Sequence, residues 1–373
     1  MRMKVAVGCT VGCTIDCGQG ARTESGKGQR VRGYVIVMAV LLPAWATAGT
    51  VYYSITDLGA LAGGTMTSAS AISTNGLAAG SGDANSTISQ PFLRSGSGIL
   101  PVSPVSSPLA FGTGVNSAGS VVGYEFSVDF STFRAFLNDA SAKYLPLLAG
   151  GTNNAATGIN DLGTVVGYSA TGSASEMAFV YSGGVARQLG TLPGGTTSRA
   201  NAVDNYGNIV GCSDTGSDAA LHAFLHSGGI WTDLGVRSGY QWSEATAVSS
   251  NQVAGTLNDP FGGTTAFLWT AASGMTALGA LVPGGNSQAF GVNAAGDVVG
   301  SSDGAAFLFH DAQMIDLATR VLSSRGWQLS EAVAINNLGQ IAGTGTHNGQ
   351  AHAFLLSPTA LHRSRPRQRK SER

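Results

Sequence analysis

A glycine ends a short apolar stretch seven times along this chain, at a nearly constant spacing. The seven positions are Gly80, Gly123, Gly167, Gly211, Gly255, Gly300 and Gly343. The steps between them are 43, 44, 44, 44, 45 and 43 residues. A period this regular indicates a repeat architecture, in which each unit buries its apolar face only by packing against its neighbours.

Each unit contains four short strand-like stretches. In the third unit these are Ala156–Asn160, Thr164–Ser169, Met177–Tyr181 and Val185–Leu189. Asn and Gly at the junctions supply the positive φ angles that tight turns between strands require. Four short strands in each repeat are typical of one blade of a β-propeller.

Two bulky residue types recur at fixed positions of the unit. Phenylalanine recurs in the third stretch, as Phe92, Phe136, Phe179, Phe224, Phe267, Phe307 and Phe354. Leucine recurs in the fourth stretch, as Leu145, Leu189, Leu234, Leu278 and Leu317, with Leu100 as a weaker match. We expect these side chains to fill the space between neighbouring sheets where it widens away from a central axis.

The two ends of the repeat region are out of phase. The last unit stops at its third stretch, HAFLLSP (His352–Pro358), whereas the region opens with an extra fourth stretch, YYSITDLG (Tyr52–Gly59), which matches WTDLG at Trp231–Gly235. A ring can pair these two ends in one sheet, and closure also protects sheet edges. The sequence therefore predicts an all-β fold: a seven-bladed β-propeller over residues 49–358, closed by an N-terminal strand that completes the last blade.

The region before the repeats has the pattern of a secretory signal. Arg30 and Arg32 precede the apolar run Tyr34–Leu42, and Ala46–Ala48 forms an A-x-A step before Gly49. The run is far shorter than the ~20 residues of a membrane span. We therefore expect residues 1–48 to be an extension plus a signal peptide, and the protein to be extracellular or periplasmic with no membrane span after cleavage. An uncleaved anchor is the alternative.

The cysteines and charges narrow the range of partners. Cys9, Cys13 and Cys17 precede the signal with no nearby fourth ligand, so we expect translation to start near Val31 and the mature chain to keep Cys212 alone. Residues 49–359 hold 8 Lys and Arg against 18 Asp and Glu. This acidic body argues against a nucleic-acid partner. Residues 359–373 are predicted to be a disordered basic tail.

Two tripeptides suggest a family. They are His222–Phe224 and His352–Phe354, both HAF, and they occur with LGTLPGGTTS at Leu189–Ser198 and with repeated IN..G..VG segments. Together these features resemble the HAF repeats of predicted bacterial extracellular proteins across essentially all of the mature chain. Five of the seven units replace the histidine, for example by Gln90 or Arg134. The resemblance implies an exported, propeller-like repeat protein, and it implies no activity for any residue.

Loops that vary between units mark one face as the place for recognition. Two inter-blade loops there, Tyr240–Ala245 and Trp327–Ala332, place an aromatic residue before a Ser-Glu-Ala step. The hypothesis for ligand binding names Arg199, Tyr240, Trp242, Glu244, Gln288, Trp327 and Glu331. Aromatic rings beside carboxylates and amides suit a sugar-like ligand. The alternative is that the two tryptophans only cover gaps between blades while the glutamates are solvated.

No residue set indicates catalysis, a metal or a cofactor. Glu244 and Glu331 would need to lie about 5–10 Å apart to act as a glycosidase pair, and two blades separate them. His222 and His352 are interpreted as structural hydrogen-bonding residues. Asp83, Asp214 and Asp303 follow the recurring glycine and are expected to begin turns rather than bind calcium, as is Asp259 one position further on.

The sequence thus predicts a non-enzymatic binding or structural module for a polysaccharide, cell-wall or protein partner, without a cofactor. The alternative function is a propeller enzyme, a hydrolase or lyase, that acts on carbohydrate.

Overall fold

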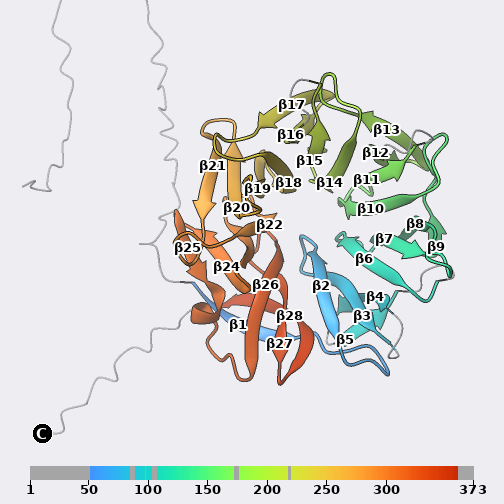
Figure 1. Ribbon diagram of the computed structural model, residues 1–373. Coiled ribbons are helices and arrows are strands. Elements are labelled where there is room, and N and C mark those ends of the chain that lie inside the picture. Colours follow the sequence, from blue (N-terminus) through green and yellow to red (C-terminus); the bar gives the residue numbers. More distant parts are fainter. Residues whose placement is uncertain are drawn as a thin grey trace, which may run out of the picture. The chain divides into compact units, whose positions relative to one another are not determined.

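Seven four-stranded antiparallel sheets form the blades of a closed ring in the computed structural model (Figure 1). The model describes residues 51–359, apart from residues 85–88, 97, 103–106, 172–175 and 217–219. The predicted signal peptide, the cysteine-rich start and residues 360–373 of the basic tail lie outside the described residues. Thr359, the first residue of the predicted tail, instead ends the last strand of the repeat region. Within the described part, no helix has the length and apolar character needed to cross a membrane.

Within each blade, the strands succeed one another from the central axis outward. The first three blades are β2 (Thr67–Ile72), β3 (Ala78–Asp83), β4 (Ser89–Ser95) and β5 (Gly98–Pro101); β6 (Ala110–Val115), β7 (Val121–Phe126), β8 (Phe133–Asn138) and β9 (Ala142–Tyr144); and β10 (Asn154–Ile159), β11 (Val165–Ala170), β12 (Glu176–Ser182) and β13 (Val185–Gly190). The next two are β14 (Ser198–Val203), β15 (Ile209–Asp214), β16 (Leu221–Ser227) and β17 (Ile230–Gly235); and β18 (Trp242–Ser249), β19 (Gln252–Asn258), β20 (Thr264–Thr270) and β21 (Gly274–Gly279).

The sixth blade is β22 (Gln288–Val292), β23 (Val298–Ser302), β24 (Ala305–His310) and β25 (Gln313–Asp316), followed by a short 3₁₀ helix, Leu317–Arg320. The seventh is β26 (Trp327–Ile335), β27 (Ile341–His347), β28 (Gln350–Thr359) and β1 (Tyr52–Asp57). In the third blade, where the bounds of all four strands were predicted from the sequence, each observed strand begins and ends within two residues of the predicted bounds.

The ring is closed by a strand from the start of the repeat region. β1 pairs antiparallel with β28, from Tyr52 opposite Thr359 to Asp57 opposite Phe354. The Leu58 N–H continues this ladder and donates to the carbonyl of Ala353 at 3.0 Å. The inner strands of the first and last blades, β2 and β26, are also in contact, and Figure 1 shows these two ends of the repeat region side by side. The predicted propeller and its mode of closure are confirmed.

The recurring glycine is required by a close approach between the two inner strands of each blade. Every inner strand has a β-bulge opposite this glycine. A Cβ added to Gly211 would lie 1.9 Å from the carbonyl oxygen of Arg199, and the six equivalent glycines would meet the equivalent oxygen at between 1.8 and 2.3 Å. No side chain fits at that distance, so glycine is the residue the bulge allows. The glycine period in the sequence therefore measures the spacing of the bulges.

The core lies between neighbouring sheets, as the bulky columns predict. All seven recurring phenylalanines are fully buried, and so are Leu145 and Leu317. The assignment of Leu100 was wrong, because this side chain is 60% exposed. Pro101 is paired with Phe92, and the next residue, Val102, is buried. Val102 rather than Leu100 therefore takes the position of the recurring leucine in this blade.

A hydroxyl at the start of each of several inner strands joins neighbouring blades. The Ser243 hydroxyl accepts a hydrogen bond from the Ala223 N–H at 2.8 Å and donates one to the carbonyl of Gly235 at 2.7 Å. The equivalent hydroxyls that make the same two bonds are those of Ser198, Ser287 and Thr67. For Thr67 the preceding blade is the seventh, so the closing junction is built like the internal ones.

The recurring aspartates have a role beyond the predicted one. Asp214 accepts hydrogen bonds from the N–H groups of Thr196 and Thr197 at 2.8 and 2.7 Å, and thus holds the loop that leads into its own blade. Asp83 and Asp303 hold the equivalent loops. Asp303 also begins the turn with Gly304 between β23 and β24, as predicted, whereas Asp83 and Asp214 end β3 and β15 and the loops after them lie partly outside the described residues. Asp259 does begin a turn, and its carboxylate accepts from Phe261 and Gly263.

Candidate functional site

Four of the seven candidate residues lie at one repeat position, near the start of the inner strands. Arg199, Glu244, Gln288 and Glu331 each pair with the residue that follows the recurring glycine on the second strand. The same position holds Ser68, Phe111 and Ala155 in the first three blades. Because the second-to-third loops and the inter-blade loops meet at this end of the strands, this is the face of the variable loops.

Three candidates line one cavity on this face. Arg199 and Glu244 come from neighbouring inner strands, β14 and β18, and Trp242 opens β18. The cavity measures about 600 Å³, and its other lining residues are Glu176, Thr197, Ser198, Cys212 and Leu221. A space of this size can hold a small polar ligand or one end of a longer one. We call it the Arg199 pocket.

The cation of the Arg199 pocket is held between an acid and an aromatic ring. Its guanidinium forms an ion pair with Glu176 of β12, and it lies 4.8 Å from the ring centroid of Tyr168 on β11. Burial lowers the pKa of Arg199, but the hydrogen bond and the charge of Glu176 more than offset this and raise it above its ordinary value. The guanidinium is thus a fixed planar donor at the edge of the pocket.

A second carboxylate, that of Glu244, also lines the pocket. Glu244 accepts a hydrogen bond from the side-chain amide of Asn201 at 2.9 Å, and the Cys212 Sγ lies 3.9 Å from it. Burial and the nearby Glu244 raise the pKa of Cys212 to about 12. The thiol is therefore protonated at neutral pH and is not an activated nucleophile.

Aromatic side chains continue this surface across the second blade. We define the aromatic cluster as Phe111, Tyr124, Phe126, Phe130, Phe133 and Tyr168. Successive ring centroids lie 5.4 to 6.4 Å apart. Phe130 at the loop tip is 62% exposed and the others are half-buried. Burial raises the pKa of both tyrosines, so their hydroxyls remain protonated donors.

Tyr168 joins the cluster to the pocket. Its ring lies 6.3 Å from that of Phe133 on one side and under the Arg199 guanidinium on the other. The sequence predicted recognition on the face of the variable loops, but the aromatic cluster was missed. The signal was present, because Phe111 and Tyr124 fall on paired positions of adjacent strands.

The remaining candidates lie outside the Arg199 pocket. The Tyr240 hydroxyl pairs with Thr265 at 3.1 Å, and Trp327 packs on Phe354 and stacks on His347, so both the tyrosine and the tryptophan stabilise blades. Gln288 is exposed at the start of β22. Burial raises the pKa of Glu331, and its hydrogen bond with Thr344 acts in the opposite direction.

The carboxylate that shares the pocket with Glu244 is Glu176, and Glu331 does not line that cavity. In the pocket, Glu176 is ion-paired with Arg199 and Glu244 is hydrogen-bonded to the Asn201 amide.

The HAF histidines pair with the aspartates of the DLG segments. His222 Nδ1 lies 2.9 Å from Asp233 Oδ1, and His352 Nδ1 lies 2.9 Å from Asp57 Oδ1. In both blades the pair joins the third strand to the fourth, beside the buried phenylalanine. These contacts are the hydrogen bonds that the structural interpretation of the two histidines expects.

Comparison with known proteins gives only distant likenesses. No family model and no curated protein matches the chain. Similar solved structures include TolB from Acinetobacter baumannii, with 12% identity, a TM-score of 0.39 and coverage of 73% of this chain and 60% of that one. The extracellular domain of a one-component system from B. thetaiotaomicron has 12% identity, a TM-score of 0.42 and coverage of 81% and 40%. The six-bladed lectin of Aleuria aurantia has 12% identity, a TM-score of 0.38 and coverage of 62% and 78%.

Proposed function

We propose that this chain is an exported β-propeller of the HAF repeat type that binds a polysaccharide without turning it over. The observation that carries the proposal is the continuity of the aromatic cluster with the Arg199 pocket through Tyr168. This surface crosses the second to the fifth blade, so it suits a chain of several sugar residues better than a single one.

The chemistry of a sugar ring matches this arrangement. A pyranose has apolar C–H faces that stack on aromatic rings, and a rim of hydroxyl groups that need donors and acceptors. Tyr124 and Phe133 offer such faces, while Arg199, Glu244 and the Tyr168 hydroxyl offer polar partners beside them. A small number of well-placed polar groups beside an apolar surface fixes the orientation of a small ligand.

Charge favours a neutral polysaccharide. The pocket contains Arg199 with Glu176 and Glu244, so its formal charge is negative, and residues 49–359 carry 10 more acids than bases. A strongly anionic polymer would meet repulsion over the whole body. A neutral chain meets none, and it can still use every donor and acceptor in the pocket.

The test compares aromatic residues on the two faces. Tyr168→Ala and Trp242→Ala remove ring area from the proposed surface, whereas Tyr206→Ala removes a 78% exposed ring from the short turn between β14 and β15 on the other face. On a glycan array we expect binding by the wild type and by Tyr206→Ala. We expect roughly a five- to thirtyfold loss for Tyr168→Ala, since stacking on one ring together with the area it buries is worth about 1–2 kcal/mol.

Three outcomes would contradict the proposal. If Tyr168→Ala and Trp242→Ala bind glycan as well as the wild type does, the binding site lies elsewhere on the molecule. If the protein binds another protein but no glycan, the ligand is not a polysaccharide. Turnover of a bound glycan that is lost in Glu244→Gln would support the carbohydrate enzyme instead. Export is tested separately by terminal sequencing of protein from the medium or periplasm, where we expect a mature chain that starts at Gly49.

A further inference from the structure

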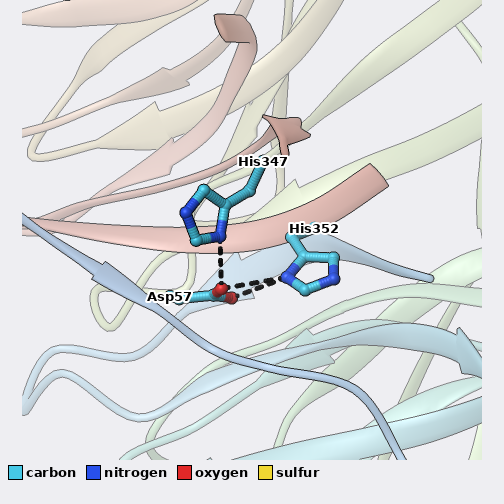
Figure 2. Close-up of side chains that lie close together, drawn as sticks. All are labelled: Asp57, His347 and His352. Atoms are coloured by element: carbon cyan, nitrogen blue, oxygen red, sulfur yellow. Dashed lines mark hydrogen bonds and ion pairs between the residues drawn. The ribbon is translucent and has the colours of Figure 1, made fainter. Parts of the chain in front are cut away.

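Three metal-binding side chains converge in the seventh blade, away from the proposed glycan surface. Figure 2 shows His347 and His352 pointing at the carboxylate of Asp57. His347 Nδ1 lies 2.8 Å from Asp57 Oδ2, and His352 Nδ1 lies 2.9 and 3.0 Å from the two carboxylate oxygens. The residues come from three strands, β27, β28 and β1. We propose that they form a binding site for a divalent transition metal ion, best matched by Zn²⁺.

The donor set and its spacing fit this ion. Two imidazoles and one carboxylate are typical Zn²⁺ ligands, whereas Ca²⁺ and Mg²⁺ prefer oxygen alone. Ligand atoms about 2.1 Å from a tetrahedral ion stand roughly 3.4 Å apart. The separations of 2.8 to 3.0 Å between each imidazole and the carboxylate need to widen by about half an ångström, and the ligand atoms of all three side chains lie within 4.8 Å of one another. A fourth position remains for water or a further ligand.

The same chain contains a matched pair without a second imidazole. In the fourth blade, His222 and Asp233 repeat the geometry of His352 and Asp57 at 2.9 Å. His347 lies two residues beyond Gly345, which pairs with His352 in the seventh blade. Among the described residues of the fourth blade, no histidine takes the corresponding place beside His222 and Asp233. A His–Asp pair alone joins two strands, so the second imidazole is the feature that turns the pair into a candidate coordination sphere.

The added imidazole is held in place. Its ring stacks on that of Trp327 with the centroids 4.6 Å apart and the planes 2° from parallel. The side-chain amide nitrogen of Asn348 lies 3.2 Å from its Nε2, and the Asn348 N–H is anchored to the carbonyl of Gly326 at 3.0 Å. When Nδ1 of His347 binds a metal ion, its ring proton is on Nε2. The side-chain oxygen of Asn348 can then accept a hydrogen bond from this Nε2–H, once the amide group has flipped by 180°.

The site is accessible. The side chains of Asp57, His347 and His352 are 30%, 25% and 18% exposed, so an ion can reach them while water remains limited. The Gly59 N–H donates to Asp57 Oδ1 at 2.8 Å and helps to hold the carboxylate in place. Because the three ligands come from three strands, a bound ion would tie the closing strand β1 to the hairpin of β27 and β28.

Metal binding is measured on the full chain, produced without a polyhistidine tag and stripped with a chelator. Co²⁺ absorption in the visible range reports tetrahedral binding, and Zn²⁺ displaces it. We expect His347→Ala to bind one equivalent less than the wild type, or to bind at least tenfold more weakly, whereas His222→Ala matches the wild type. In parallel, Zn²⁺ at 100 times its dissociation constant should raise the midpoint of thermal unfolding by roughly 5 °C in the wild type and in His222→Ala only.

Asp57→Asn is a second test that keeps the shape of the side chain and removes its charge, and circular dichroism checks that each variant is folded. Loss of the Co²⁺ signal in Asp57→Asn supports the site even where His347→Ala fails to fold. The proposal is overturned by identical Co²⁺ titrations of wild type, His347→Ala and Asp57→Asn. It is also overturned by a wild type that shows neither Co²⁺ absorption nor a thermal shift with millimolar Zn²⁺.

Discussion

At one end of the seven inner strands the residues are nearly uniform, and at the other end they differ from blade to blade. The end at the short turns carries Ser73, Asn116, Asn160, Asp204, Ser249, Asn293 and Asn336. The end at the variable loops carries Ser68, Phe111, Ala155, Arg199, Glu244, Gln288 and Glu331. The two sets lie at opposite ends of the same inner strands, five residues apart, and yet only the first keeps one kind of side chain, short and polar.

Hydrogen bonds within the short turns, and between blades at several of them, explain the uniform end. The Asn160 side-chain amide donates to the carbonyl of Asp204 in the next blade at 2.9 Å, and that of Asn336 donates to the carbonyl of Ser73 across the closing junction at 3.1 Å. In six of the seven turns the side-chain oxygen at this position also accepts from an N–H group of its own turn, so a short polar side chain is kept. At the other end, Arg199 and Glu244 line the Arg199 pocket and Phe111 belongs to the aromatic cluster, so the identity of these side chains can follow a ligand rather than the ring.

The largest effect is expected from opening the ring, because both ends of the inner strands depend on closure. Deletion of residues 51–59 removes β1 and leaves β28 without its outer partner. We expect this to cancel most of a folding free energy of about 5–15 kcal/mol and to promote association through the exposed strand edge. Thermal melts and light scattering measure the two effects. Deletion of residues 360–373 is the control, and equal stability of both deletions would contradict the role of closure.

A smaller effect is expected from filling the space at one bulge. Gly211→Ala places a methyl group 1.9 Å from the Arg199 carbonyl oxygen, so the bulge must shift at a cost of about 2–4 kcal/mol. The same shift moves Arg199, so binding at the pocket should weaken as well. Gly98→Ala is the matched control, since its added Cβ meets nothing within 4 Å. Urea denaturation compares the variants, and a neutral Gly211→Ala would show that the bulge tolerates a side chain.

The two ends of the inner strands should respond differently to loss of a side chain. Asn160→Ala removes an amide that bridges blades and also accepts from the N–H groups of Leu162 and Thr164, so we expect a loss of about 1–3 kcal/mol. Gln288→Ala removes an exposed side chain, and its effect should lie within about 0.5 kcal/mol. Equal losses in urea denaturation would remove the distinction between the two ends.

The smallest effects are expected from pH, and they have opposite signs at the two ends. Asp161 beside Asn160 is partly buried, but hydrogen bonds with Ser117, Asn205 and Thr74 hold its pKa below the ordinary value. Its contribution is therefore present above the unfolded pKa of about 3.9 and is lost as pH falls through the lower folded pKa. Burial raises the pKa of Glu331, so its contribution is present below the unfolded pKa and is lost as pH rises through the folded one.

Stability measured from pH 3 to pH 7 checks both signs. Asp161→Asn should be destabilised near pH 7 and less so near pH 3. Glu331→Gln should be stabilised near pH 7 and match the wild type near pH 3. A pH profile that is unchanged in both variants would contradict the assigned directions.

Much of the fold could be predicted because it is periodic. The glycine, phenylalanine and leucine columns gave the number of blades, and the extra stretch at Tyr52–Gly59 gave the closure. The reason for the glycine could not be predicted, because the bulge that meets Gly211 is a backbone feature with no residue type of its own. The Leu100 assignment failed for a related reason: the residue that takes the inward position there is a valine two positions later.

The candidate site was predictable only where it follows the repeat. Arg199, Trp242 and Glu244 share or adjoin one repeat position on neighbouring blades, and they line one cavity. Glu176 was missed because its contact with Arg199 depends on two long side chains that reach between blades. The Asp57, His347 and His352 cluster was missed because His347 lies off the repeat and Asp57 is 290 residues away from it.

The pairing of β1 with β28 also sets the order in which this polypeptide can acquire its native state. Residues 52–57 are made early, yet the strand that pairs with them ends at Thr359. Synthesis or translocation that proceeds from the N-terminus therefore leaves the first strand waiting until nearly the whole chain has emerged. The first six blades can form in the meantime, and the ring closes only when β28 has emerged and pairs with β1.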